Sequence, residues 1–123
     1  MKIERELMRG AGPVAVLKLL ERGEKYGYEL VQDLSRESGG VLAMGQSTLY
    51  PMLYNLEAKK LVASRMDESG PRPRKYYRLT DKGLKRLSHD TQQWRALLEA
   101  MASLGVLGSE DGIASPQAKG GPA

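Results

Sequence analysis

The sequence predicts a mainly α fold of the α+β class, a winged helix-turn-helix with a helical core, a two-stranded wing and a long C-terminal dimerisation helix. Three observations predict it. Apolar residues repeat with helical spacing in residues 46–61, alternation with a period of two follows in 62–66 and 74–79, and a longer helical repeat runs from 84 to 101. With 123 residues, the chain has length for one modest core.

Residues 46–61 form the helix on which the functional interpretation depends. Its apolar residues fall at i, i+3, i+4 and i+7, namely Leu49, Met52, Leu53 and Leu56. Pro51 lacks an N–H, so we expect the helix to begin at Ser47 or Thr48. The opposite face is small, hydroxylated or aromatic and has no charge: Ser47, Tyr50, Pro51, Tyr54 and Ala58. Such a face suits a DNA recognition helix, and the alternative is a core helix with an accidental polar face.

Three helices are expected before it. The first covers residues 2–9 and is expected to end at the Gly10-Ala-Gly-Pro13 run. The second begins at Pro13 and ends at Gly23, with enough apolar residues to lie at the centre of the core. The third begins near Tyr26 and ends at residues 39–40, so that it and the recognition helix form the helix-turn-helix pair.

A basic hairpin is predicted directly after the recognition helix. Two alternating strands, 62–66 and 74–79, are separated by a turn at 67–73 that holds two prolines and a glycine. Residues 63–88 contain eight Lys or Arg and three acids, a balance of +5 in a chain whose net charge is +4. This local excess is expected of a polyanion partner and makes the hairpin a wing, although an ordinary solvated hairpin is the alternative.

The C-terminal helix is expected to begin after Thr80 as N-cap and to reach about Leu104. Its apolar stripe is longer than a small winged domain needs, which predicts a homodimer; the alternative is a helix that folds back on its own domain. The expected interface residues are Leu7, Met8, Leu87, Trp94, Leu97, Leu98 and Met101. The domain organisation is then 1–79 for the DNA-binding domain, 80–104 for the dimerisation helix and 105–123 for a disordered tail.

The expected DNA contacts fall into three groups. Gln46, Ser47, Thr48, Tyr50 and Tyr54 are expected to face the major groove. The start of the preceding helix is expected to meet backbone phosphates through Lys25, Tyr26 and Tyr28. Further phosphate contacts are expected from the end of the recognition helix and from the wing, through Lys59, Arg72, Arg74 and Lys75.

Three ordered stretches, Tyr26–Leu30, Ser47–Glu57 and Arg74–Gly83, strongly resemble the PadR family of bacterial transcription regulators. The resemblance covers about residues 5–100 and implies a winged helix-turn-helix with a C-terminal dimerisation helix. It also implies repression that is released by a small molecule or another signal. A single C-terminal helix is similar to the short-tailed branch of the family.

In multidrug-sensing members of that branch, a tryptophan on the C-terminal helix lines an apolar cavity at the dimer centre and stacks on flat ligands. The resemblance places Trp94 at that position. The alternative is that Trp94 fills the dimer seam. Two departures stand out: Lys60 replaces a glycine that usually ends the recognition helix, and Asn55 replaces a common basic residue.

Together these features predict a dimeric, sequence-specific DNA-binding transcriptional regulator, a repressor relieved by a planar or aromatic effector near the dimer interface. A ligand-binding or protein-binding winged-helix module without DNA binding is the alternative. An enzyme is not expected, because the chain has no Cys, one His and no Gly-rich phosphate loop. No metal or cofactor is predicted, and the charged N-terminus favours a cytoplasmic protein without a signal peptide or a membrane span.

Overall fold

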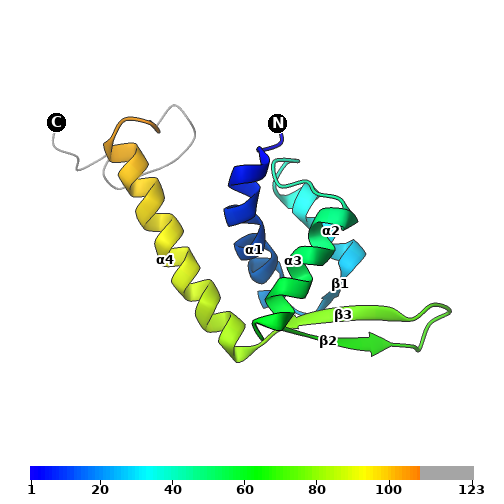
Figure 1. Ribbon diagram of the computed structural model, residues 1–123. Helices are drawn as coiled ribbons and strands as arrows, with labels where there is room; N and C mark the ends of the chain where they lie inside the picture. The colour runs from blue at the N-terminus through cyan, green and yellow to red at the C-terminus, as the bar shows by residue number, and fades with distance from the viewer. Residues whose placement is uncertain (109–123) are drawn as a thin grey trace. The chain divides into compact units, whose positions relative to one another are not determined.

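A computed structural model describes residues 1–108 (Figure 1). The elements are α1 (Arg5–Glu21), β1 (Lys25–Tyr26), α2 (Gly27–Glu37), α3 (Gln46–Ala58), β2 (Val62–Asp67), β3 (Arg74–Leu79) and α4 (Asp81–Ser103). The chain divides into two compact units between Leu87 and Ser88. The predicted fold class, a helical core with a β-wing and a long last helix, is confirmed.

The core of the first unit is formed by the apolar faces of α1, α2 and α3. Val16, Leu30, Leu49 and Leu53 have no exposed surface. The apolar face predicted for the recognition helix is therefore confirmed, with Met52 half-buried at its edge. The helix begins at Gln46, one residue before the expected start, and Gly45 is its N-cap.

The predicted break in the first helix is wrong. One continuous helix, α1, runs through the Gly10-Ala-Gly-Pro13 run, and Pro13 lies inside it. Gly12 explains part of this run, because a Cβ there would lie 2.7 Å from Cε of Met52. A larger residue at this position would thus displace the end of the Met52 side chain between α1 and α3. Burial of the apolar face against the core outweighs the one hydrogen bond that a proline removes from a helix.

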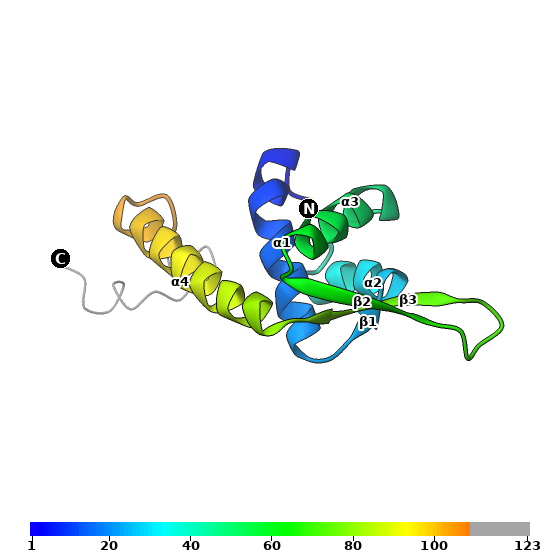
Figure 2. The same ribbon diagram turned by 60° about the horizontal axis from the view of Figure 1, so that its bottom comes forward.

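A third strand, which was not predicted, pairs with the two-stranded wing. The sheet order is β1-β3-β2, all antiparallel, and β1 pairs Lys25 with Tyr77 and Tyr26 with Tyr76 (Figure 2). Strand β1 has two residues, too few to show an alternating pattern in the sequence. It forms because it pairs with β3, which lies about 50 residues further along the chain. The β2–β3 hairpin that was predicted is present, and it pairs Val62 with Leu79 at its base.

The turn after α3 keeps the geometry that normally calls for glycine. Lys60 has a φ of 64°, and its N–H donates to the carbonyl of Glu57 at 2.9 Å. The N–H of Leu61 donates to the carbonyl of Leu56 at 2.9 Å, and both leucines are buried. These are the two hydrogen bonds and the apolar contact of a Schellman motif.

Replacing Lys60 by glycine should stabilise the protein by about 0.5–1 kcal/mol, because a side chain in the left-handed region costs more than the extra freedom of glycine in the unfolded chain. Urea denaturation measures the change. Lys59→Gly is the matched control, since Lys59 has an ordinary helical φ of −82° and should lose stability on the same substitution. Equal losses for the two variants would contradict the prediction.

α4 begins with the predicted N-cap. The Thr80 hydroxyl accepts a hydrogen bond from the N–H of Gly83 at 3.0 Å and donates to the carbonyl of Lys60 at 2.7 Å. The helix ends at Ser103, and Gly105, two residues later, has a left-handed φ of 87°. Its first turns, with Gly83 and Leu87 buried, belong to the first unit.

The predicted domain boundaries, 1–79 and 80–104, stay predictions. Of the tail expected at 105–123, residues 105–108 form the turn after α4, and the rest lies outside the described residues. No helix within residues 1–108 has the length and apolarity needed to cross a membrane.

Candidate nucleic-acid interface

The uncharged face of α3 lies on the surface of the first unit. Gln46, Ser47 and Thr48 are exposed, as are the two tyrosines, with exposed fractions of 42% for Tyr50 and 73% for Tyr54. The fully buried side chains of Leu49 and Leu53 hold the opposite face in the core. The five residues expected to face the major groove are therefore all accessible to a partner.

Tyr50 also packs against the neighbouring helix. A Cβ on Gly27, the first residue of α2, would lie 2.5 Å from the Tyr50 hydroxyl oxygen and 2.7 Å from Cε1 of its ring. Only a residue without a side chain lets this ring lie on the start of α2. Tyr50 therefore fixes the spacing of the helix-turn-helix pair while its remaining surface stays exposed.

The outer face of the sheet carries stacked rings and guanidinium groups. The rings of Tyr26 and Tyr76 meet edge to face with centroids 5.5 Å apart. The Arg74 guanidinium lies 4.6 Å from the centroid of Tyr26, and that of Arg65 lies 5.0 Å from Tyr76. Arg65 is also paired with Glu24, which lowers the pKa of that carboxyl. Arg74 is thus positioned by an aromatic ring, while the charge of Arg65 is used within the fold.

Tyr26 was expected to meet phosphates from the start of a helix. It is the last residue of β1 and the N-cap of α2, and its backbone N–H donates to the Glu29 carboxylate of α2 at 3.1 Å. Its ring lies beneath the guanidinium of Arg74. The sequence interpretation missed Glu24 and Arg65, because their pairing joins residues 41 positions apart.

Lys25 is committed to a contact inside the protein. Its ammonium lies 2.9 Å from a carboxylate oxygen of Asp33, whose other oxygen accepts a hydrogen bond from Arg36 at 2.6 Å. Asp33 is only 7% exposed. Burial raises the pKa of this carboxyl, but the hydrogen bond and charge of Lys25, with the charge of Arg36, outweigh burial and lower it. Tyr28, in the first turn of α2, is exposed.

Asp33→Asn should lower the free energy of unfolding by about 1–2 kcal/mol at neutral pH, because Lys25 loses its partner. The pKa of Asp33 is lower in the folded chain than in the unfolded chain. Its contribution is therefore present above the unfolded pKa of about 4, and it is lost as the pH falls through the folded value. Urea denaturation at about pH 7 and about pH 3 should show the gap to the unaltered chain narrowing at the lower pH. Glu68→Gln in the exposed wing turn is the control. If the difference in free energy of unfolding between Asp33→Asn and the unaltered chain increased at low pH, the stabilising role of ionised Asp33 would be contradicted.

The three cations predicted for the wing point to different surroundings. Arg72 lies exposed in the turn between β2 and β3. Arg74 lies on the outer sheet face, as described above. Lys75 lies on the other face, with its ammonium 3.7 Å from the Glu57 carboxylate of α3 and 5.5 Å from the centroid of Tyr77. Lys59, at the end of α3, is exposed. Arg72 and Arg74 are the wing cations best placed to meet a polyanion.

The residues expected at a dimer interface differ in exposure. Leu97 and Leu98 are exposed on α4, and Trp94 and Met101 are half-buried there. Leu7 is exposed on α1. Met8 and Leu87 are 7% and 4% exposed in the core of the first unit, so most of their surface is already covered within one chain. Trp94, the expected effector contact, lies on the same helix as Leu97 and Leu98.

No group of three His, Asp or Glu side chains that could hold a metal ion occurs within residues 1–108. His89 is an exposed residue of α4. The exposed face of α3 and the exposed wing cations form the main candidate surface for a partner.

Comparison with known proteins identifies the family. The sequence pattern of the Transcriptional regulator PadR-like family matches residues 16–89, which cover the helix-turn-helix, the wing and the start of α4. The chain belongs to this family. The match, together with the fold described above, makes it a PadR-like transcriptional regulator and not an enzyme.

Individual PadR-like relatives agree with this assignment. The chain is 36% identical over 98 residues to Transcriptional regulator Rv3488 of Mycobacterium tuberculosis, covering 80% of this chain and 85% of that protein. A PadR family transcriptional regulator from Eggerthella lenta has a similar structure, with 40% identity and a TM-score of 0.73 over 80% of this chain and 85% of the other. Bacillus subtilis PadR, solved in complex with operator DNA, is 31% identical with a TM-score of 0.61, over 67% of this chain and 46% of that one.

Proposed function

We propose that this PadR-like regulator is a homodimer that binds double-stranded DNA with sequence specificity and represses transcription until a small planar or aromatic effector binds near the dimer interface. The observation that carries the proposal is the exposed, uncharged face of α3, with Arg72 and Arg74 on the wing that follows it. Bacillus subtilis PadR, a relative with operator DNA in its structure, supports this reading.

DNA recognition would divide between α3 and the wing. The amide of Gln46 can pair with an adenine edge, and the hydroxyls of Ser47 and Thr48 can bond to several bases. Tyr50 and Tyr54 offer flat rings for thymine methyl groups and a hydroxyl for a base or phosphate. Arg72 and Arg74 would bind phosphates beside the groove that α3 occupies, and this fixes the register of the helix without reading sequence.

Dimerisation and effector binding are assigned to the apolar residues of α4. Leu97 and Leu98 are exposed in the single chain, and Leu104 is 78% exposed just after the helix. Two-fold pairing through such surface would relate two α3 helices by symmetry, and successive major grooves lie about 34–36 Å apart. Trp94 would offer its indole to a flat ligand at the seam, so that an effector could change the spacing of the two recognition helices.

Footprinting of the full chain on DNA upstream of its own coding sequence tests the function. The expected result is protection of two half-sites about one helical turn apart, abolished by Tyr54→Ala together with Ser47→Ala. Sedimentation should give a dimer. The alternative is a ligand-binding winged-helix module that does not bind DNA. It would be favoured if that DNA were not shifted in a gel-retardation assay while planar aromatic compounds quenched the fluorescence of Trp94.

A further inference from the structure

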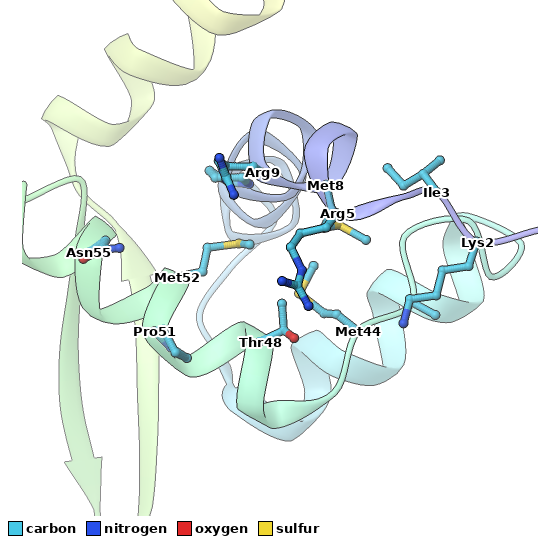
Figure 3. Close-up of a pocket in the computed structure, with 12 residues that line it drawn as sticks. Lys2, Ile3, Arg5, Met8, Arg9, Met44, Thr48, Pro51, Met52 and Asn55 are labelled. Atoms are coloured by element: carbon cyan, nitrogen blue, oxygen red, sulfur yellow. The ribbon is translucent and has the colours of Figure 1, made fainter.

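A groove lies between the N-terminal turns of α1 and one flank of α3, and it has a volume of about 710 Å³. Its floor includes the side chains of Met8, Met44 and Met52 (Figure 3). Thr48 and Asn55 supply polar groups from the α3 side. The lining contains three cations, Lys2, Arg5 and Arg9, and no acid. A groove with this lining is suited to an anion.

The cations of this groove are little used within the fold. Arg9 lies 3.8 Å from Glu6, and both side chains are more than 70% exposed, which makes the pair weak. Lys2 and Arg5 are exposed and have no ion pair among residues 1–108. Lys25 and Arg65 differ, because Asp33 and Glu24 already hold their charges. The positive charge at the start of α1 is therefore available to a partner.

The groove adjoins the uncharged face of α3. Helical geometry places Pro51 one turn from Ser47 and from Tyr54, so the flank that lines the groove borders the face assigned to DNA. The Arg5 guanidinium extends toward Thr48, in the first turn of α3 (Figure 3). The wing, in contrast, follows the C-terminal end of α3. The two sets of cations thus come from different parts of the chain, the N-terminal residues with α1 and the wing.

We propose that Lys2, Arg5 and Arg9 bind phosphates of the DNA backbone alongside the flank of α3 that lines the groove. The inference rests on the proposed function, which places α3 in a major groove. That groove is about 12 Å wide, so a sugar-phosphate strand runs along each flank of an inserted helix. The α1 cations then hold one strand and the wing holds another part of the backbone. The amide of Asn55 can donate to the same phosphates, since neutral donors commonly share backbone contacts.

The test is a salt series of DNA binding by the full chain carrying Arg5→Ala and Arg9→Ala, followed by fluorescence anisotropy. Each lost phosphate contact removes about 0.9 from the slope of log K against log salt, so the slope should fall by about two. At about 0.1 M salt the Kd should rise on the order of fiftyfold. The increase should be equal on the footprinted site and on an unrelated duplex, because phosphate contacts do not read sequence.

Two matched variants separate charge from other effects. Lys18→Ala with Arg22→Ala removes the same charge from the other end of α1 and its following residue, where Glu21 and Glu37 pair with these cations. This control should leave the slope close to that of the unaltered chain. Arg5→Lys with Arg9→Lys should keep the slope, since the cations remain. Circular dichroism should show equal helix content in all variants.

The outcomes distinguish this inference from the function on which it rests. The first outcome is that the unaltered chain protects the DNA upstream of its coding sequence, but the Arg5→Ala, Arg9→Ala variant has the same salt slope. This result would overturn the proposed phosphate contact of α1 and leave the proposal of DNA binding in place. A slope that falls equally in the Lys18→Ala, Arg22→Ala control would overturn it as well. An unaltered chain that binds no DNA would overturn both proposals.

Discussion

Alanine at position 83 is expected to lower the free energy of unfolding by about 3 kcal/mol or more, the upper end of what overpacking usually costs. A Cβ on Gly83 would lie 2.0 Å from the carbonyl oxygen of Leu61 and 2.8 Å from Cδ1 of Leu79. The first of these is a backbone atom and cannot rotate away. The substitution should therefore force the start of α4 off the end of the recognition helix.

The carbonyl of Leu61 is also held in place from the other side. It accepts a hydrogen bond from the N–H of Thr80 at 3.1 Å, and it shares the single proton of the Thr80 hydroxyl, 3.0 Å away, with the Lys60 carbonyl. Moving this carbonyl to admit a methyl group would break the N–H bond and weaken the N-cap of α4. Moving the Leu61 carbonyl aside would itself cost free energy. We therefore expect structural relaxation to relieve little of the clash, and the free energy of unfolding of Gly83→Ala to fall by nearly the full amount.

Thermal unfolding measures the effect of Gly83→Ala. For a domain of this size each kcal/mol corresponds to about 4–8 °C, so the melting temperature should fall by more than about 10 °C. Gly70→Ala is the control: its nearest neighbour to a Cβ is the Arg72 carbonyl oxygen at 4.0 Å, and its melting temperature should change little. A Gly83→Ala protein that melts with the control would disprove the close approach.

The second large effect is expected from the wing. Arg72→Ala combined with Arg74→Ala should weaken DNA binding by the same factor on all sequences, on the order of fiftyfold at about 0.1 M salt. Arg72 is exposed in the wing turn, and Arg74 lies on the ring of Tyr26 with its guanidinium at the sheet surface. Both are exposed and placed to contact phosphates, although the charge of Arg74 is also felt by the Asp67 carboxylate, which lies opposite it on β2.

The salt dependence of binding is the measurement for the wing. The slope of log K against log salt should become less steep by about two, whereas the Lys18→Ala, Arg22→Ala control should keep its value. An unchanged slope in the wing variant would refute the assignment of these arginines. Tyr26→Phe, which retains the ring beneath Arg74, should bind as the unaltered chain does.

The elements that sequence predicted correctly are those whose pattern is contiguous. The apolar spacing of Leu49, Leu53 and Leu56 defines the buried face of α3 without reference to any other element. The alternation of 62–66 and 74–79 defines the wing in the same way, and the N-cap role of Thr80 depends on its own hydroxyl and the next three residues.

The features that sequence did not reveal depend on partners far along the chain. A helix-breaking composition at Gly10–Pro13 is overridden because Gly12 meets Met52 and the rest of α1 is buried. Strand β1 exists only because β3 pairs with it. Whether Lys25 is free to meet DNA depends on Asp33, and whether Lys60 can occupy a left-handed turn depends on the bonds around it. Local patterns cannot report such contacts.

The position of Tyr26 has a consequence for the motions of the first unit. This residue pairs with β3, caps α2 through its backbone N–H and carries Arg74 on its ring. Separation of β3 from β1 would also disturb the N-terminus of α2. Amide hydrogen exchange in β3 and in the first turn of α2 should therefore report the same free energy of opening. The hairpin and the helix-turn-helix would then open locally as one cooperative unit. A signal that destabilised one of them would destabilise the other.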